Sequence, residues 1–353
     1  MDKPILASIL SCQTTRLTDN EKYLFEKFNP LGVSLFARNI ETKEQLKALV
    51  DDIKNTINRD DILIGIDQEG GRVSRISSLS NNQYVSQKTL GKNPIEYTQA
   101  HATLIANELH EYGININYSP VVDKSSSSSV LATRCFSPNS KDIEAYASQM
   151  ANTYIDMGIC PCIKHIPGHF AVSKDPHLEV LEIDMTLKEV IKEIEYLSFI
   201  AKYPMAMTSH IKLSQIDDKN PTTTSPKIIS NIIRETLNFD GFLISDAIDM
   251  HALKGTIEEK HNQALDAKID ATCYCSGKIE DLEQICYSKR FMTEKSLIRF
   301  ENIKKVIHNK PNKVNIEALK NFYNNGLKDW LSETYLYDAT EVLHQMQKKG
   351  EYL

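Results

Sequence analysis

The sequence has no apolar run long enough for a membrane helix and no block of basic residues. The run ILASIL at positions 5–10 is shorter than the roughly 7 to 15 residues of a signal-peptide core and far shorter than the ~20 of a membrane helix. The formal net charge of −6 is spread along the chain, which argues against a surface that binds nucleic acid through phosphates. We therefore expect a cytoplasmic protein with neither a membrane nor a nucleic-acid partner.

The seven cysteines contain no C-x-x-C pair and are odd in number, which argues against a disulfide framework. Cys160 and Cys162, like Cys273 and Cys275, are two residues apart within apolar runs, so each pair faces one side of a strand. No second pair at zinc-site spacing accompanies either one, which favours core packing over metal binding. We expect reduced thiols, no metal and no cofactor.

The composition is that of an ordinary globular protein. Apolar residues make up 41% of the chain and charged residues 25%, close to typical soluble domains, so a large core can be buried. The length of 353 residues suits either two average domains or one large barrel, because α/β barrels often occupy roughly 250 residues or more. The choice between them depends on the pattern along the chain.

Short apolar runs alternate with stretches of helical periodicity. The runs lie at 4–10, 32–37, 62–67, 116–123, 159–165, 204–211, 241–246 and 271–276, and the helical stretches at 42–57, 94–113, 140–158, 187–201 and 225–237. This alternation predicts parallel βα units, and eight of them indicate a single (β/α)8 TIM-type barrel, although a doubly wound open sheet gives a similar pattern.

The ends of the predicted helices support these assignments. Thr42 with Gln45 has the spacing of a capping box, and Ser225 before Pro226 is a typical helix start. After residue 277 no strand pattern appears, and 294–309 and 332–349 are the best helical stretches. We expect residues 1–353 to form one domain, with helices after about residue 280 packed on the barrel.

In a βα barrel the active site is built at the carboxyl ends of the strands, so polar residues just after each apolar run are the candidates. Asp246 stands where the apolar segment GFLI stops, the position expected for a catalytic carboxylate, but it equally suits a helix N-cap. The other candidates after successive runs are Asp67, Glu69 and Arg75, then Asp123 and Arg134, then the segment KHIPGHFAVSKDPH at 164–177, then His210 and Lys212, and lastly Asp249.

The histidines of segment 164–177 have several interpretations. His165 and His169 are four residues apart, but Pro167 and Gly168 between them break the helix that would align two zinc ligands. In the segment Asp175-Pro176-His177, a carboxylate two residues from an imidazole is able to orient it as a general acid/base. An exposed turn built around Pro176 explains the same residues.

Four segments in order resemble the bacterial β-N-acetylglucosaminidases of glycoside hydrolase family 3 that act in peptidoglycan recycling. They are LFARN (35–39), DQEGGRVSR (67–75), KHIPGH with DPH (164–177) and FDGFLISDAIDM (239–250), and the resemblance extends over roughly residues 5 to 280. The resemblance implies a single barrel and the removal of terminal β-linked N-acetylglucosamine from cytosolic muropeptides that carry 1,6-anhydro-N-acetylmuramic acid. We expect a monomer without cofactor.

The resemblance also implies roles for single residues. The family's nucleophile falls on Asp246, and its acid/base falls on His177, held by Asp175. A retaining glycosidase uses two such groups about 5 Å apart, one attacking the anomeric carbon and one protonating the leaving oxygen. The family's sugar-binding residues fall on Asp67, Arg75, Arg134, Lys164 and His165.

The chain departs from the family pattern at two places. Where the family commonly reads GHGDT, this chain has Phe170, Ala171 and Val172 after Gly168-His169, which puts the motion of that loop in doubt; where it reads SDDLSM, Ala247 follows Asp246. Three alternatives stay open from the sequence: a phosphorylase using the same site, a metal-dependent barrel hydrolase, and a sugar-binding descendant without activity. The metal site would be formed by His165, His169 and His210.

Overall fold

The computed structural model describes residues 3–80, 82–124, 131, 133–170 and 181–331. The predicted acid/base pair, Asp175 and His177, and the helix predicted at 332–349 therefore lie outside the described residues.

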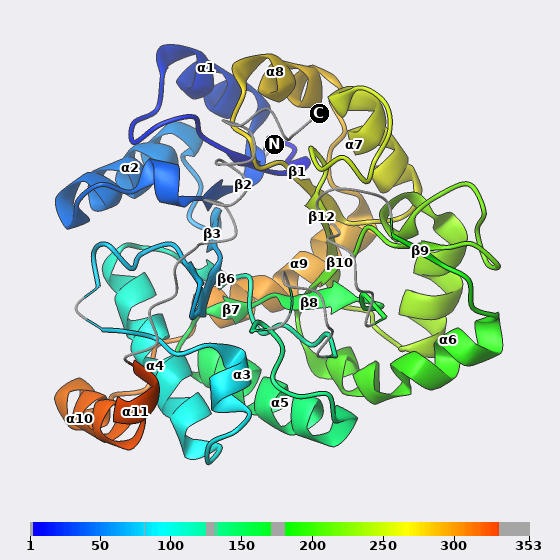
Figure 1. The fold of residues 1–353 in the computed structure, drawn as a ribbon. Coiled ribbons are helices and arrows are strands. Elements are labelled where there is room, and N and C mark those ends of the chain that lie inside the picture. The colour runs from blue at the N-terminus through cyan, green and yellow to red at the C-terminus, as the bar shows by residue number, and fades with distance from the viewer. Residues whose placement is uncertain (1–2, 81, 125–130, 132, 171–180, 332–353) are drawn as a thin grey trace, which may run out of the picture.

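The centre of the molecule is a ring of parallel strands (Figure 1). The nine-stranded sheet has the order β7-β6-β3-β2-β1-β13-β12-β10-β8. Its first and last strands, β7 (Cys160–Pro161) and β8 (Ile163–Ile166), follow each other in the chain with only Cys162 between them, so the ring closes. The predicted α/β barrel is confirmed, and the open-sheet alternative is wrong.

Each of the predicted apolar runs overlaps a strand of the ring. The runs are continuous rather than alternating because the strands of a parallel barrel are buried on both faces. In β1 (Leu6–Ser11) and β2 (Pro30–Leu35), for example, every residue is buried. The other strands of the ring are β3 (Leu63–Ile66), β6 (Ile116–Asn117), β10 (Met205–Thr208), β12 (Phe242–Ala247) and β13 (Ala271–Cys273).

Two small sheets extend the barrel beyond the ring, and the sequence pattern did not predict them. One is the antiparallel hairpin of β4 (Gln68–Gly70) and β5 (Val73–Ser74), which directly follows β3. The other pairs β9 (Glu182–Ile183) with β11 (Lys212–Leu213). Both are built from segments that follow carboxyl ends of ring strands, the end at which a barrel binds its ligands.

Helices surround the ring (Figure 1). Three predicted helices match α2 (Lys43–Ile57), α4 (Glu96–Glu111) and α5 (Ser140–Asp156), whereas α1 (Asp19–Phe28), α3 (Gln87–Leu90) and α7 (Ile257–Asp266) were not predicted. The stretch 187–201 divides into α6 (Leu187–Ile194) and a 3₁₀ helix (Glu195–Lys202), and most of 225–237 is a π-helix (Ile228–Thr236).

Thr42 and Ser225 cap their helices as predicted, but the capping box at Thr42 is incomplete. The Thr42 hydroxyl accepts a hydrogen bond from the Gln45 amide at 3.1 Å, as predicted. The Gln45 side chain, however, accepts from the amide of Glu41 at 2.8 Å instead of that of Thr42, so the reciprocal half of the capping box is shifted by one residue. The Ser225 hydroxyl accepts from the Ile228 amide at 3.1 Å, which confirms its N-cap position.

The helices after β13 occupy different sides of the barrel. Beyond α8 (Ile279–Tyr287), α9 (Glu294–Ile307) runs behind the ring in Figure 1 and closes its amino-terminal end. Phe300, Ile303 and Val306 of α9 join the apolar cluster inside the ring. By contrast, α10 (Ile316–Gly326) packs on the outside against α4, followed by α11 (Lys328–Leu331). None of the helices in the described part of the chain has the length and apolar character needed to cross a bilayer.

Candidate active site

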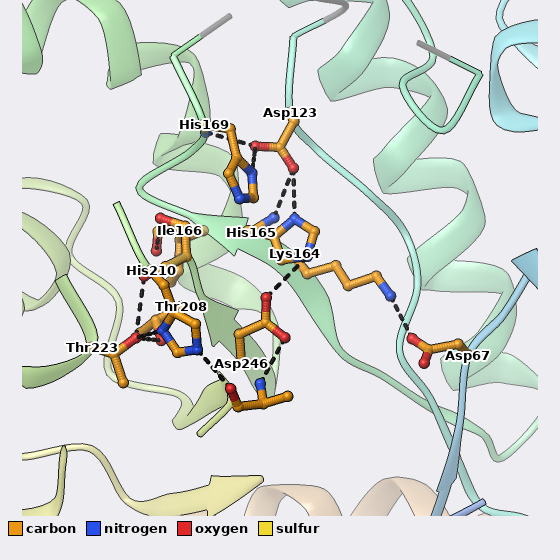
Figure 2. Close-up of polar contacts among 12 residues, drawn as sticks. Asp67, Asp123, Lys164, His165, Ile166, His169, Thr208, His210, Thr223 and Asp246 are labelled. Carbon is orange, nitrogen blue, oxygen red and sulfur yellow. Dashed lines mark hydrogen bonds and ion pairs between the residues drawn. The ribbon is translucent and has the colours of Figure 1, made fainter. Parts of the chain in front are cut away.

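The candidate residues from distant parts of the chain meet at the carboxyl end of the ring. Lys164 and His165 belong to β8, Asp67 follows β3, and Asp246 lies near the end of β12. Figure 2 shows the Lys164 side chain directed toward Asp67, and the His165 ring between Asp123 and Asp246. The closed ring brings these residues together because all of its strands run in parallel.

A network of ion pairs forms one side of the site. Lys164 Nζ lies 2.6 Å from Asp67 Oδ1 and 2.7 Å from Glu69 Oε1. Arg134 binds Glu69 in a bidentate manner, with Nε–Oε2 and Nη2–Oε1 distances of 2.9 and 2.8 Å. Arg75 Nη2 lies 3.4 Å from Asp67 Oδ2. Among these five groups there is one more cation than there are anions, a balance that suits a ligand rich in hydroxyl or carboxylate oxygens.

The network keeps its members charged. Burial on its own would raise the pKa of Asp67, but the charges of Lys164 and Arg75 outweigh it and hold the pKa well below its usual range. Burial likewise opposes ionisation of Glu69, whose pKa is lowered to about 2 by Arg134 and Lys164. Burial lowers the pKa of Lys164, but its two carboxylate partners raise it more. The site therefore presents fixed charges at neutral pH.

Asp123 holds two histidine rings at once. Its Oδ2 accepts from Nδ1 of His165 at 2.8 Å and from the His165 amide at 3.2 Å. Its Oδ1 accepts from Nδ1 of His169 at 3.0 Å and from the His169 amide at 2.9 Å. Burial would raise the pKa of Asp123, but His169 and His165 hold it well below its usual range. An ionised Asp123 fixes the proton of each ring on Nδ1.

His165 faces the predicted nucleophile. Its Nε2 lies 3.8 Å from Oδ2 of Asp246. Burial lowers the pKa of His165 despite the opposing charge of Asp123, so the ring is neutral at pH 7 and its Nε2 carries a lone pair. Such a nitrogen is able to accept a hydrogen bond from a sugar hydroxyl. The Asp246 side chain is 21% exposed, and its Oδ1 accepts from the Ala247 amide at 2.7 Å.

His210 lies on the other side of Asp246 and positions the backbone. Its Nδ1 contacts Thr223 Oγ1 at 2.7 Å, and its Nε2 donates to the carbonyl oxygen of Ala247 at 2.9 Å (Figure 2). Burial lowers its pKa, although Asp246 opposes the shift. Both ring nitrogens are thus engaged with groups next to the end of β12.

The described residues do not place His210 with His165 and His169, the three ligands of the alternative metal site. The described residues that place possible ligand atoms within 4.8 Å of one another are Asp123, His165 and His169, without His210. In that group, both Nδ1 atoms donate to Asp123, and each carboxylate oxygen already accepts two hydrogen bonds. Hydrogen bonds within this group thus engage both Nδ1 atoms and both carboxylate oxygens, and they account for its arrangement without His210.

Phe170 occupies a backbone conformation that favours glycine. Its φ is +53°, in the left-handed region, at the position where the resembled family commonly has glycine. The side chain is partly buried against the main apolar core. The backbone after His169 thus keeps a glycine-like turn although the residue is bulky, and contact with the core stabilises it. Ala171 and Val172 lie outside the described residues.

Comparison with known proteins decides the family. The glycosyl hydrolase family 3 N-terminal domain matches residues 8–306. The chain belongs to glycosyl hydrolase family 3. The resemblance inferred from the four sequence segments is thereby confirmed, as is the prediction of a glycoside hydrolase.

Curated relatives and solved structures agree with family 3. A β-hexosaminidase of Idiomarina loihiensis is 31% identical over 273 residues, covering 75% of this chain and 82% of the relative. A β-hexosaminidase of Hydrogenovibrio crunogenus is 29% identical over 314 residues, covering 84% of this chain and 87% of the relative. The fold matches NagZ of Neisseria gonorrhoeae in complex with N-trifluoroacetyl-D-glucosamine (TM-score 0.80, 22% identity, 94% of this chain and 99% of that one). It also matches a family 3 β-N-acetylglucosaminidase of Paenibacillus sp. FPU-7 (TM-score 0.80, 20% identity, 91% of this chain and 67% of that one).

The structure adds roles that the sequence did not assign. Glu69 and Asp123 were recognised only as polar residues after strands, yet Glu69 joins two of the predicted sugar-binding cations and Asp123 orients two histidines. The sequence feature that indicated a role for Glu69 and Asp123 was their position at or just after the ends of the third and fourth apolar runs. The residues that the structure brings together at the carboxyl end of the ring are Asp67, Arg75, Arg134, Lys164, His165 and Asp246.

Replacing Lys164 with methionine is expected to lower the free energy of unfolding at pH 7 by about 3–5 kcal/mol, because the buried Glu69 and the largely buried Asp67 lose their shared cation. Because the pKa values of Asp67 and Glu69 are lower in the folded protein, their ionised forms stabilise the folded wild type at pH values above the unfolded carboxyl pKa, about 4. This stabilisation is lost as the pH falls toward the pKa values of the folded state. The difference between variant and wild type should therefore shrink below about pH 4.

Urea unfolding at several pH values measures this effect. The control is Lys212→Met, which removes a partly exposed pair with Glu182 at 3.5 Å and should cost less than about 1 kcal/mol. A Lys164→Met loss no larger than that of the control would show that the network does not stabilise the barrel.

Proposed function

We propose that this family 3 enzyme is a retaining β-N-acetylhexosaminidase that removes terminal β-linked N-acetylglucosamine from peptidoglycan fragments. The substrate is a muropeptide in which this sugar is joined to 1,6-anhydro-N-acetylmuramic acid, with or without peptide. The observation that carries the proposal is the Asp246 carboxylate at the end of β12, 3.8 Å from a neutral His165 that Asp123 orients. The relatives named β-hexosaminidase support a β-linked hexosamine as the class of sugar removed.

The proposed reaction has two displacement steps. Asp246 Oδ2 attacks the anomeric carbon and forms a glycosyl ester while the bond to the leaving oxygen breaks, and His177 gives that oxygen its proton. His177, oriented by Asp175, then takes a proton from water as the water oxygen attacks the anomeric carbon, and the carboxylate of Asp246 is released. Asp175 and His177 have these roles from the family resemblance and lie outside the described residues.

The proposed sugar site is the ion-pair network with His165. Asp67 is positioned to accept hydrogen bonds from sugar hydroxyls, and its side chain is 18% exposed beside Lys164. Arg75, Arg134 and Lys164 supply donors for hydroxyl oxygens, and Asp67 and Glu69 offset two of their three positive charges. Fixed donors and acceptors of this kind orient the anomeric carbon toward Asp246.

We propose that the enzyme works in the cytoplasm as a monomer, with residues 1–353 forming one catalytic domain. Two observations support the cytoplasmic location: the seven cysteines are all free, and six of them are buried. Pairing of β1 with β13 supports the single domain, because it joins the two ends of the barrel sequence.

The test is release of sugar from N-acetylglucosaminyl-1,6-anhydro-N-acetylmuramic acid and from an aryl β-N-acetylglucosaminide, with inorganic phosphate present. We expect free N-acetylglucosamine from both substrates. A His177→Ala variant should lose more activity on the muramic acid substrate than on the aryl substrate, whose leaving group needs less protonation. Formation of sugar 1-phosphate would show a phosphorylase instead, and absence of turnover with intact binding would show a sugar-binding protein.

A further inference from the structure

We propose that α10, on the outside of the barrel, positions the substrate site through a buried hydrogen-bond relay from Tyr323 to His101 to the backbone of Glu69. Tyr323 and His101 act as positioning residues for the β4–β5 hairpin. The sugar as ligand rests on the proposed function, whereas the relay itself rests on the contacts alone. Helix α10 lies beyond residues 8–306, which match family 3.

The relay consists of three buried hydrogen bonds. The hydroxyl oxygen of Tyr323 accepts from the amide of Val85 at 3.0 Å and lies 2.9 Å from His101 Nδ1. His101 Nε2 lies 3.1 Å from the carbonyl oxygen of Glu69. The side chains of Tyr323 and His101 are 0% exposed. The contact between Tyr323 and His101 joins residues 222 positions apart, from α10 to α4.

The direction of each hydrogen bond follows from the chemistry of its acceptor. The Glu69 carbonyl only accepts, so His101 Nε2 carries the proton and donates. Burial lowers the pKa of His101 to about 4, so at neutral pH Nδ1 is a lone-pair acceptor for the Tyr323 hydroxyl. Each member of the relay therefore has a defined role, and loss of the hydroxyl leaves two buried groups, His101 Nδ1 and the Val85 amide, without this partner.

The relay ends on the residue that organises the sugar-binding cations. The side chain of Glu69 binds Arg134 at 2.8 Å and Lys164 at 2.7 Å. A shift of the Glu69 backbone would therefore move the carboxylate that holds both cations. The backbone beside it lies directly on His101: a Cβ at Gly70, where φ is +95°, would come within 2.7 Å of the His101 ring. The position of Glu69 thus depends on contact with α4 and, through it, α10, in addition to the two hydrogen bonds that join the Gln68 backbone to the Asn117 side chain of β6.

The hairpin needs support from outside. Among the described residues, β4 and β5 pair with each other and with no ring strand, and a two-stranded hairpin is at best marginally stable by itself. The Tyr84 ring meets His101 edge-on with centroids 5.3 Å apart, and the Gly71 amide donates to the Tyr84 carbonyl oxygen at 2.8 Å. The relay and these contacts attach the β4–β5 hairpin to α4 and α10.

The test uses full-length variants and two independent measurements. Tyr323→Phe keeps the ring and removes the hydroxyl; His101→Leu removes both ring nitrogens, and His101→Gln restores a donor toward Glu69. The matched control is Phe322→Leu, the neighbour on α10, which stacks on Tyr97 with centroids 4.8 Å apart and takes no part in the relay. The measurements are steady-state kinetics on an aryl β-N-acetylglucosaminide and hydrogen exchange of the amides at 68–74.

We expect Tyr323→Phe and His101→Leu to raise KM about five- to tenfold, the factor that corresponds to one hydrogen bond, with kcat within about twofold of wild type. Exchange at 68–74 should accelerate in both variants, His101→Gln should lie closer to wild type than His101→Leu, and Phe322→Leu should match wild type in both measurements.

Unchanged KM and unchanged exchange in Tyr323→Phe and His101→Leu would overturn the relay, even if both variants lost thermal stability. Equal effects of Phe322→Leu would also overturn it, since they would show general destabilisation by α10. If the wild type does not hydrolyse the glycoside, the proposed function fails, but the exchange measurement still decides whether α10 positions the hairpin.

Discussion

Asp246→Asn is expected to lower kcat for glycoside hydrolysis by about four orders of magnitude, because an amide oxygen is a poor nucleophile toward the anomeric carbon. The change is nearly isosteric, and the asparagine oxygen is able to keep the hydrogen bond that Asp246 Oδ1 accepts from the Ala247 amide at 2.7 Å. The fold and the free energy of unfolding should therefore change little. KM for the aryl substrate and the thermal midpoint, measured beside kcat, check this.

Asp249→Asn is the matched control for that prediction. Asp249 is the next carboxylate along the chain, but it accepts hydrogen bonds from the Cys275 amide at 3.2 Å and from the Ser276 hydroxyl. Its role is to hold the segment after β13, and an asparagine oxygen is able to keep the amide contact. We expect kcat within a few-fold of wild type. Comparable losses in the two variants would contradict a nucleophile at Asp246.

Asp123→Asn is expected to reduce kcat/KM by about a hundredfold, because misplacing a group that orients the substrate costs about that factor. In the wild type each Asp123 oxygen accepts from one imidazole and one amide, which points His165 Nε2 at Asp246. The amide group of asparagine presents donors to one of these histidines, so its ring must turn or change tautomer. Kinetics on the aryl substrate and histidine NMR spectra measure both effects.

The control for Asp123 has to separate catalysis from stability. Asp217 is 5% exposed and accepts from the amides of Lys219 and Asn220 and from the Ser225 hydroxyl at 2.7 Å. Asp217→Asn should lower the free energy of unfolding by about 1–3 kcal/mol with kcat/KM little changed. If Asp123→Asn behaves in the same way, with loss of stability and normal kcat/KM, the orienting role assigned to Asp123 is wrong.

The barrel and its active end were predictable from the sequence for a physical reason. Strands buried on both faces must be continuous apolar runs, and polar residues directly after them must lie at the carboxyl end of the ring. This rule brought Asp67, Lys164 and Asp246 together before any contact was known. It also distinguished the carboxyl end from the amino-terminal end, which α9 covers with Phe300 and its apolar neighbours.

The pairing of charges within the site was not predictable in the same way. Asp123 and His165 are 42 residues apart, and their contact depends on the distance between adjacent ring strands and on side-chain direction. The bidentate contact of Glu69 with Arg134 depends on the β4–β5 hairpin, whose short strands give almost no periodic signal. The link from Tyr323 to Glu69 requires the docking of α10 on α4, which no local pattern specifies.

The most direct test of the account is to trap the covalent intermediate. A fluorinated N-acetylglucosaminyl donor with a good leaving group slows both displacement steps but allows the first, so the sugar should stay bound to the nucleophile. After digestion, mass spectrometry should find one sugar adduct on the peptide that contains Asp246, and fragmentation should assign it to that residue. An adduct on a different residue, or turnover of the donor with inverted anomeric configuration and no adduct, would contradict a glycosyl-Asp246 intermediate.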